Sequence, residues 1–120
     1  MQVANLELCK TLWELSGWKV STNPEGWHWV MDGQRYQRQV APAYDLGYLL
    51  RKLPETLKHP ATGVDYTIGL SRLIDTKKWL ADYSRSMLPN ANADTPEDAT
   101  CKLAIELFKQ DVLTKGQEQG

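Results

Sequence analysis

The sequence has few cysteines, no excess of either charge and no long apolar run. Fourteen Lys and Arg residues nearly balance fifteen Asp and Glu residues, so the formal net charge is −1. A protein that binds mainly the DNA backbone usually carries a clear positive excess. Direct sequence-specific DNA binding is therefore not expected. Since no apolar run approaches a membrane span and no leader pattern is present, we expect a cytoplasmic protein that does not bind membranes.

The two cysteines, Cys9 and Cys101, belong to no CxxC or Cys/His cluster. Each lies within a helix-like pattern, where a free thiol behaves as a small buried hydrophobic group of a reducing compartment. We therefore favour two free, buried thiols. A disulfide or a zinc site is the minor alternative, and neither a metal nor another cofactor is expected.

Motifs of catalysis are also missing. The sequence has no GxSxG or His-x-Glu arrangement, which are patterns of nucleophilic and metal-dependent chemistry. His59 has no cysteine or acidic neighbour at ligand spacing. His28 lies between two tryptophans of a predicted strand and is interpreted as a surface histidine. We assign no catalytic residue and expect a protein that is not an enzyme.

Apolar residues at helical spacing predict helices over 5–16 and 44–53. Gly17 suits the end of the first helix, because this position often has a positive φ. Pro54 ends the second helix, because the residue before a proline avoids helical backbone.

The segment 95–113 has the most complete local signals of any element. Thr95 is a suitable N-cap, Pro96 fits the first helical position and Asp98 holds the capping-box position. An apolar face that includes Leu107 follows. Burying one such side chain contributes about 1.5 to 3 kcal/mol, against about 1 kcal/mol for the cap. Packing of this face therefore decides whether the helix forms.

Alternating residues predict a β-hairpin with strands over 27–31 and 34–40. Between them, Asp32 and Gly33 are typical of a two-residue type I′ turn, since both of its central positions need a positive φ. The hairpin therefore forms the first half of the predicted sheet.

Two more strands are predicted, over 66–71 and 79–84, and for the second a helix over 76–83 is the alternative. The segments 55–63 and 85–94 are interpreted as loops. The predicted order is α-β-β-α-β-β-α. It indicates an α+β fold in which an antiparallel sheet of about four strands is covered by helices. Residues 1–114 form one domain, and 115–120 form a polar tail.

The chain is rich in aromatic side chains with a polar atom, with five Trp and five Tyr against one Phe. They suit ligand pockets and interfaces, and they serve equally in a core. Trp27 and Trp29 share one strand face, so they form either a platform for a base or part of the core. Basic and amide side chains nearby suit phosphate, ribose and base edges. The candidate ligand-binding residues are Trp27, Trp29, Arg35, Tyr36, Arg38, Arg72, Arg85, Asn90 and Asn92.

Three segments carry a resemblance to a known type of protein. They are PAYDLGYLLRKLP at 42–54, ADTPEDATCKLAIELF at 93–108, and the helix end SGW at 16–18. Together they resemble the phage ABA-sandwich type of small protein, which tailed phages and prophages encode and which mostly has no assigned activity. The shared motifs are caps, a proline entry and a leucine stripe, so they imply a fold more than a function.

The resemblance implies a phage accessory protein, and small phage proteins without enzyme motifs often act by binding. We expect an anti-defence protein of the host cell cytoplasm that sequesters a nucleotide-derived immune signalling molecule. Two alternatives are a protein-binding inhibitor of a host defence effector, of the anti-CRISPR type, and a non-catalytic structural or replication accessory protein. A homo-oligomer is also expected, because surplus aromatic side chains favour self-association.

Overall fold

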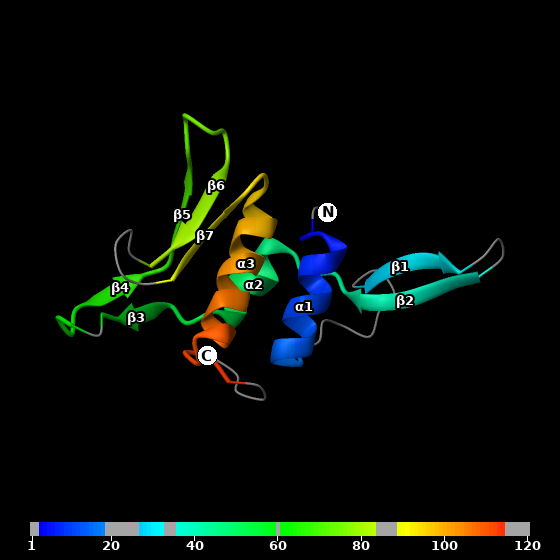
Figure 1. The fold of residues 1–120 in the computed structure, drawn as a ribbon, viewed down its shortest axis with the longest axis horizontal. Helices are drawn as coiled ribbons and strands as arrows, with labels where there is room; N and C mark the ends of the chain where they lie inside the picture. Colours follow the sequence, from blue (N-terminus) through cyan, green and yellow to red (C-terminus); the bar gives the residue numbers. More distant parts are fainter. Residues whose placement is uncertain (1–2, 19–26, 33–35, 60, 84–88, 115–120) are drawn as a thin grey trace.

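The computed structural model describes residues 3–18, 27–32, 36–59, 61–83 and 89–114. These residues form three helices and seven strands, and every strand pairing is antiparallel. The helices lie together at the centre, and the strands extend outward from them (Figure 1). The elements are α1 Leu6–Ser16, β1 Trp27–Asp32, β2 Tyr36–Pro42, α2 Leu46–Lys52, β3 Thr56–Lys58, β4 Asp65–Thr67, β5 Gly69–Arg72, β6 Trp79–Asp82, β7 Asn90–Ala93 and α3 Pro96–Lys109.

The strands divide into three sheets, β1-β2, β3-β4 and β5-β6-β7. The predicted α+β class is confirmed, but one sheet of about four strands is replaced by seven strands in separate sheets. The strand predicted over 66–71 is two strands, because β4 pairs with β3 whereas β5 pairs with β6. The strand prediction over 79–84, rather than a helix, is confirmed by β6.

Two segments predicted as loops contain short strands. β3 lies within 55–63 and β7 lies within 85–94. β3 has three residues and β7 has four. Asn and Ala do alternate along β7, but so short a run does not distinguish a strand from a loop. Their partners β4 and β6 supply the hydrogen bonds that make them strands.

The predicted hairpin is confirmed, but its turn is not the predicted one. β1 and β2 pair with Asp32 opposite Tyr36, so Asp32 is a strand residue and a two-residue turn centred on Asp32 and Gly33 is wrong. The register shifts between His28 and Trp29, where β2 holds one extra residue. β2 ends at Pro42, two residues beyond the predicted end of the strand.

Local caps begin each helix, and the one at Thr95 is the cap that the sequence predicts. The side chains of Asn5, Asp45 and Thr95 accept hydrogen bonds from backbone N–H groups in the first turns of α1, α2 and α3. Gly17 ends α1 with a φ of 70°, a conformation that glycine adopts without strain. α3 ends at Lys109, four residues before the predicted end, and Gln110 is its C-cap residue.

The core surrounds α3. This helix buries Leu103, Leu107 and Phe108, which confirms its predicted apolar face. α1 adds Leu12 to this core, and α2 adds Leu49. The remaining buried hydrophobic residues are Ala4, Cys9, Trp18, Ala41, Tyr44, Leu53, Ala81, Tyr83, Ala93, Ala99, Cys101, Ala104, Ile105 and Leu113.

Candidate functional site

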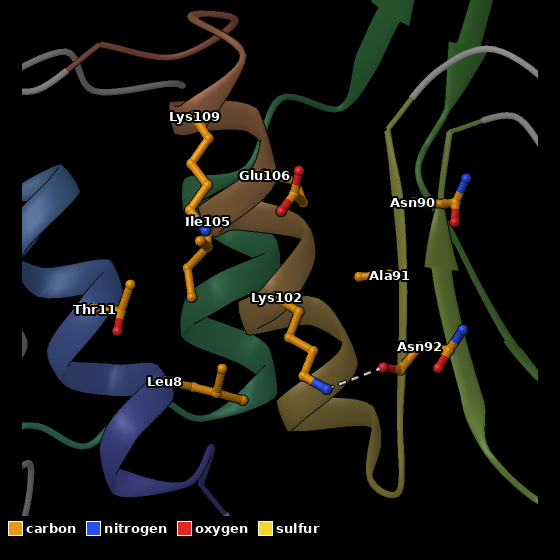
Figure 2. Close-up of a pocket in the computed structure, with 9 residues that line it drawn as sticks. All are labelled: Leu8, Thr11, Asn90, Ala91, Asn92, Lys102, Ile105, Glu106 and Lys109. Carbon is orange, nitrogen blue, oxygen red and sulfur yellow. Dashed lines mark hydrogen bonds between the residues drawn. The ribbon is translucent and has the colours of Figure 1, made fainter.

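A hollow of about 380 Å³ lies beside α3, between α1 and β7 (Figure 2). α3 supplies the floor, α1 supplies one wall and β7 the other. We name this hollow the α3 groove. Its lining residues are Leu8, Thr11, Asn90, Ala91, Asn92, Lys102, Ile105, Glu106 and Lys109.

The helical period places the charged part of the groove. Lys102, Glu106 and Lys109 recur at intervals of four and three residues, so they share one side of α3. Ile105 lies beside them and is 5% exposed, whereas both lysines are exposed. The floor therefore carries two ammonium groups and one carboxylate around an apolar centre.

The strand period determines what β7 presents to the groove. Ala91 points toward α3, whereas the carboxamides of Asn90 and Asn92 point away from it (Figure 2). Asn90 and Asn92 are both exposed. The backbone of these two residues therefore borders the groove, while their side chains face the other side of the sheet.

One hydrogen bond joins the floor to the wall. Lys102 Nζ donates to the backbone carbonyl of Asn92 at 3.4 Å (Figure 2). Within the described residues β7 pairs with β6 alone, so it is an edge strand of the three-stranded sheet. The groove thus combines an edge strand, two cations and an apolar floor, which suits a ligand with anionic and backbone-like hydrogen-bonding groups.

The structure separates the other predicted ligand-binding residues. Arg72 ends β5 and is exposed, and it lines a different hollow together with Ile74. Trp27 begins β1 and is half-buried, and its ring meets that of Trp13 edge to face, with centroids 5.4 Å apart. Trp27 therefore packs against α1, and the α3 groove contains neither Trp27 nor Arg72.

The remaining predicted ligand-binding residues have side chains that lie outside the described part of the structure. Trp29, Tyr36 and Arg38 lie in β1 and β2, but their side chains are outside the described part of the structure. Arg35 and Arg85 lie outside the described residues altogether. The predicted aromatic platform therefore stays a prediction.

The expected surface position of His28 is wrong. His28 is half-buried, and its Nε2 lies 3.1 Å from the Ala4 carbonyl and 3.4 Å from Cys9 Sγ. Both residues contact the α1 region: Trp27 meets Trp13, and His28 meets Ala4 and Cys9. Only the three-dimensional packing could show this contact.

The histidines and carboxylates form no metal site in the described residues, where no group of three His, Cys, Asp or Glu side chains is placed to hold an ion. His59 is buried, and its Nδ1 accepts a hydrogen bond from the Ala61 N–H at 3.1 Å. Its role is therefore to hold a turn. Among the described helices, none is long and apolar enough to cross a membrane.

The groove residues of α3 were not predicted as a site. Lys102, Glu106 and Lys109 form the stripe that a sequence pattern assigns to solvent, and nothing nearby in the sequence indicates that β7 lies opposite. Comparisons with protein-family models, with curated proteins and with solved structures gave no match for this chain. The groove and its chemistry are therefore the basis for inferring a function.

Proposed function

We propose that this chain acts by binding, as an accessory protein that inhibits a host defence effector, and that its α3 groove takes an extended acidic segment of that effector. One observation carries the proposal: the edge strand β7 borders a groove whose floor presents Lys102 and Lys109. An extended peptide can pair with an open strand edge through backbone hydrogen bonds, while its side chains alternate into neighbouring pockets.

The groove divides these two tasks between its β7 wall and its α3 floor. β7 would provide backbone affinity, and Ala91 is small enough to let a second chain approach α3. Lys102 and Lys109 would pair with acidic side chains of the partner, and exposed charges of this kind influence specificity and association rate more than affinity. Leu8 and Ile105 offer the apolar contact that a buried anchor needs.

The setting that we propose is phage infection, and it rests on the resemblance of three segments to small proteins of tailed phages. In that setting the protein would act in the cytoplasm of the host cell. Inhibition by binding requires affinity for one conformation of the effector and no chemical step, so we propose no enzymatic role.

A selection experiment tests the peptide proposal. Random peptides displayed on a carrier are selected against the folded protein, and Lys102→Glu/Lys109→Glu is the test variant. Lys77→Glu/Lys78→Glu, which changes the same charges at the β5–β6 connection, is the matched control. We expect Asp- or Glu-containing extended peptides that bind wild type and the control, with about tenfold weaker binding to the test variant. Equal binding by all three proteins would contradict the proposal.

A second candidate is the nucleotide-derived signalling molecule. The observation in its favour is a hollow of about 380 Å³ with two ammonium groups, since ligand pockets commonly enclose about 300 to 1,000 Å³ and lysine binds phosphate. A thermal-shift panel of cyclic dinucleotides and ADP-ribose derivatives separates the two candidates. A rise in melting temperature that the Lys102→Glu/Lys109→Glu variant loses would support the nucleotide; no rise with any compound would reject it.

We also propose that the chain is a homo-oligomer. Its radius of gyration is 15.2 Å, whereas a globular chain of this length has a value of about 13.6 Å. Ile74 is 90% exposed at the β5–β6 connection. An extended molecule with an exposed aliphatic side chain leaves apolar surface that a second copy can cover. Sedimentation of wild type and Ile74→Asp tests this; a monomer in both cases would contradict it.

A further inference from the structure

The free edge of β7 presents the backbone groups of Asn90 and Asn92 to the α3 groove. In an antiparallel ladder the N–H and C=O of one residue point to the same side of the strand, and those of the next residue point to the other side. The Asn92 carbonyl accepts from Lys102 Nζ at 3.4 Å, so it points away from β6 and toward the groove. Asn90, two residues earlier, presents its N–H and C=O to the same edge. A strand added at this edge therefore bonds to Asn90 and Asn92 and places one of its residues opposite Ala91.

Ala91 determines which side chains of an added strand face α3. It points toward α3 (Figure 2), and residues opposite each other in paired strands have side chains on the same face of the sheet. The partner residue opposite Ala91, named the central residue, therefore faces α3. The residues two positions before and after it, named the outer residues, face α3 as well, and the two residues between them face the other side of the sheet.

We propose that the segment bound in the α3 groove has the pattern acidic-x-aliphatic-x-acidic, with the aliphatic central residue opposite Ala91 and an acid at each outer position. Glu106 excludes an acidic central residue. This inference rests on the proposed function, because it names the sequence class of the extended segment that the groove takes.

The spacing of the two lysines along α3 fits the outer residues. An α-helix rises about 1.5 Å per residue, so Lys102 and Lys109 attach about 10 Å apart along the axis. Outer residues four positions apart in a strand are separated by about 13 Å, and the flexible lysine side chains span the difference. Both lysines are exposed, and within the described part of the chain neither forms an ion pair with Asp or Glu. Each lysine can therefore pair with one outer acid.

The centre of the groove selects an aliphatic side chain. Ile105 lies between the two lysines along α3, and Leu8 of α1 lines the same hollow. Glu106 also lines it, and its carboxylate accepts a hydrogen bond from Gln110 at 3.5 Å but pairs with no cation among the described residues. A second carboxylate at the central position would therefore meet an uncompensated negative charge, whereas an aliphatic side chain would contact Ile105 and Leu8.

Three synthetic peptides with blocked ends test the pattern on the wild-type protein. The pattern peptide is Thr-Glu-Thr-Leu-Thr-Glu-Thr, and the permuted peptide Thr-Thr-Glu-Leu-Glu-Thr-Thr has the same composition and charge. The third peptide, Thr-Glu-Thr-Glu-Thr-Glu-Thr, carries an acid at the central position. We expect the pattern peptide to bind at least about tenfold more tightly than either of the others in isothermal titration. Equal binding by the pattern and permuted peptides would overturn the inference.

A variant tests the role of Glu106. Glu106→Gln should strengthen binding of the third peptide at least about threefold and leave the pattern peptide unchanged, because only the third peptide places a carboxylate beside it. Glu14→Gln is the matched control, since Glu14 is exposed on α1 and does not line the groove. The same response from both variants would contradict the role of Glu106. The comparison of peptides on the wild type needs no variant to fold.

The failure of the pattern and the failure of the proposed function give different results. If peptides selected by display bind through Lys102 and Lys109 but the pattern peptide does not, the groove is a peptide site and the pattern is wrong. If neither the selected peptides nor the three synthetic peptides bind, the proposed function and the pattern are both rejected.

Discussion

The backbone N–H of Asn5 donates a hydrogen bond of 2.7 Å to Oδ1 of Asp98. Asn5 is the N-cap residue of α1, and Asp98 lies in the first turn of α3. The carboxylate in the predicted capping-box position therefore does not return to Thr95. It joins the starts of two helices that are 93 residues apart in sequence.

Asp98→Ala should lower the free energy of unfolding by about 1 to 3 kcal/mol, because it removes a charged acceptor and leaves the Asn5 N–H without this partner. Asp94→Ala is the control, since Asp94 is exposed and precedes the cap. Urea denaturation measures both changes. Equal effects of the two substitutions would show that the bond between α1 and α3 contributes nothing specific.

Two glycine substitutions should change stability in opposite directions. Gly17→Ala should cost about 1 kcal/mol, because φ at this C-cap is 70°. Gly47→Ala should stabilise the protein by about 0.5 to 1 kcal/mol, because Gly47 is helical and exposed. The added Cβ would meet only the side chains of Arg51 and Asp45, at 3.4 and 3.5 Å. Thermal and urea unfolding check the pair, and a loss of stability with Gly47→Ala would contradict the second expectation.

Cys9 should lose its proton below the ordinary range of a thiol, because the interaction with Cys101 lowers its pKa from 9.0 to about 6. A lowered folded-state pKa adds stability above the unfolded value, and this stability is lost as pH falls through the folded value. Relative to Cys9→Ser, the wild type should therefore gain stability between pH 6 and pH 9. Ultraviolet thiolate absorbance and denaturation at several pH values measure both effects; a thiolate step that Cys9→Ser retains would contradict the assignment.

The helices could be predicted because their signals are local. Thr95 with Pro96, and Gly17 at the end of α1, act within a few residues of the helix end that they cap. In contrast, β3 and β7 have only three and four residues, and their partners determine that they are strands. The sequence pattern of a short segment does not show which strand it will pair with.

The candidate site was missed for the same reason. Lys102 and Lys109 have the spacing of a solvated stripe, and only the position of β7 makes them part of a groove. Asn90 and Asn92 were predicted as ligand-binding residues, and their backbone does border that groove, although their carboxamides face away from α3. The contact of His28 with Cys9 likewise depends on how the β1–β2 hairpin meets α1.

Replacing Lys109 alone should weaken binding in the α3 groove less than replacing both lysines. Lys102 already donates to the Asn92 carbonyl, so its substitution removes a contact that positions the groove wall as well as a charge. Lys109→Ala should leave the melting temperature unchanged within error and make peptide binding less dependent on salt. Isothermal titration at several salt concentrations checks this, and an unchanged salt dependence would contradict a role for Lys109 in binding.

The most direct measurement is an NMR titration of the labelled protein with a peptide selected on the wild type. If the peptide adds to the edge of β7, the largest backbone amide shifts should occur at Asn90, Ala91 and Asn92, with slower hydrogen exchange in β7 and smaller shifts along Lys102 to Lys109. Shifts concentrated in the β1–β2 hairpin or at Ile74, with β7 unchanged, would show that the chain binds its partner somewhere other than the α3 groove.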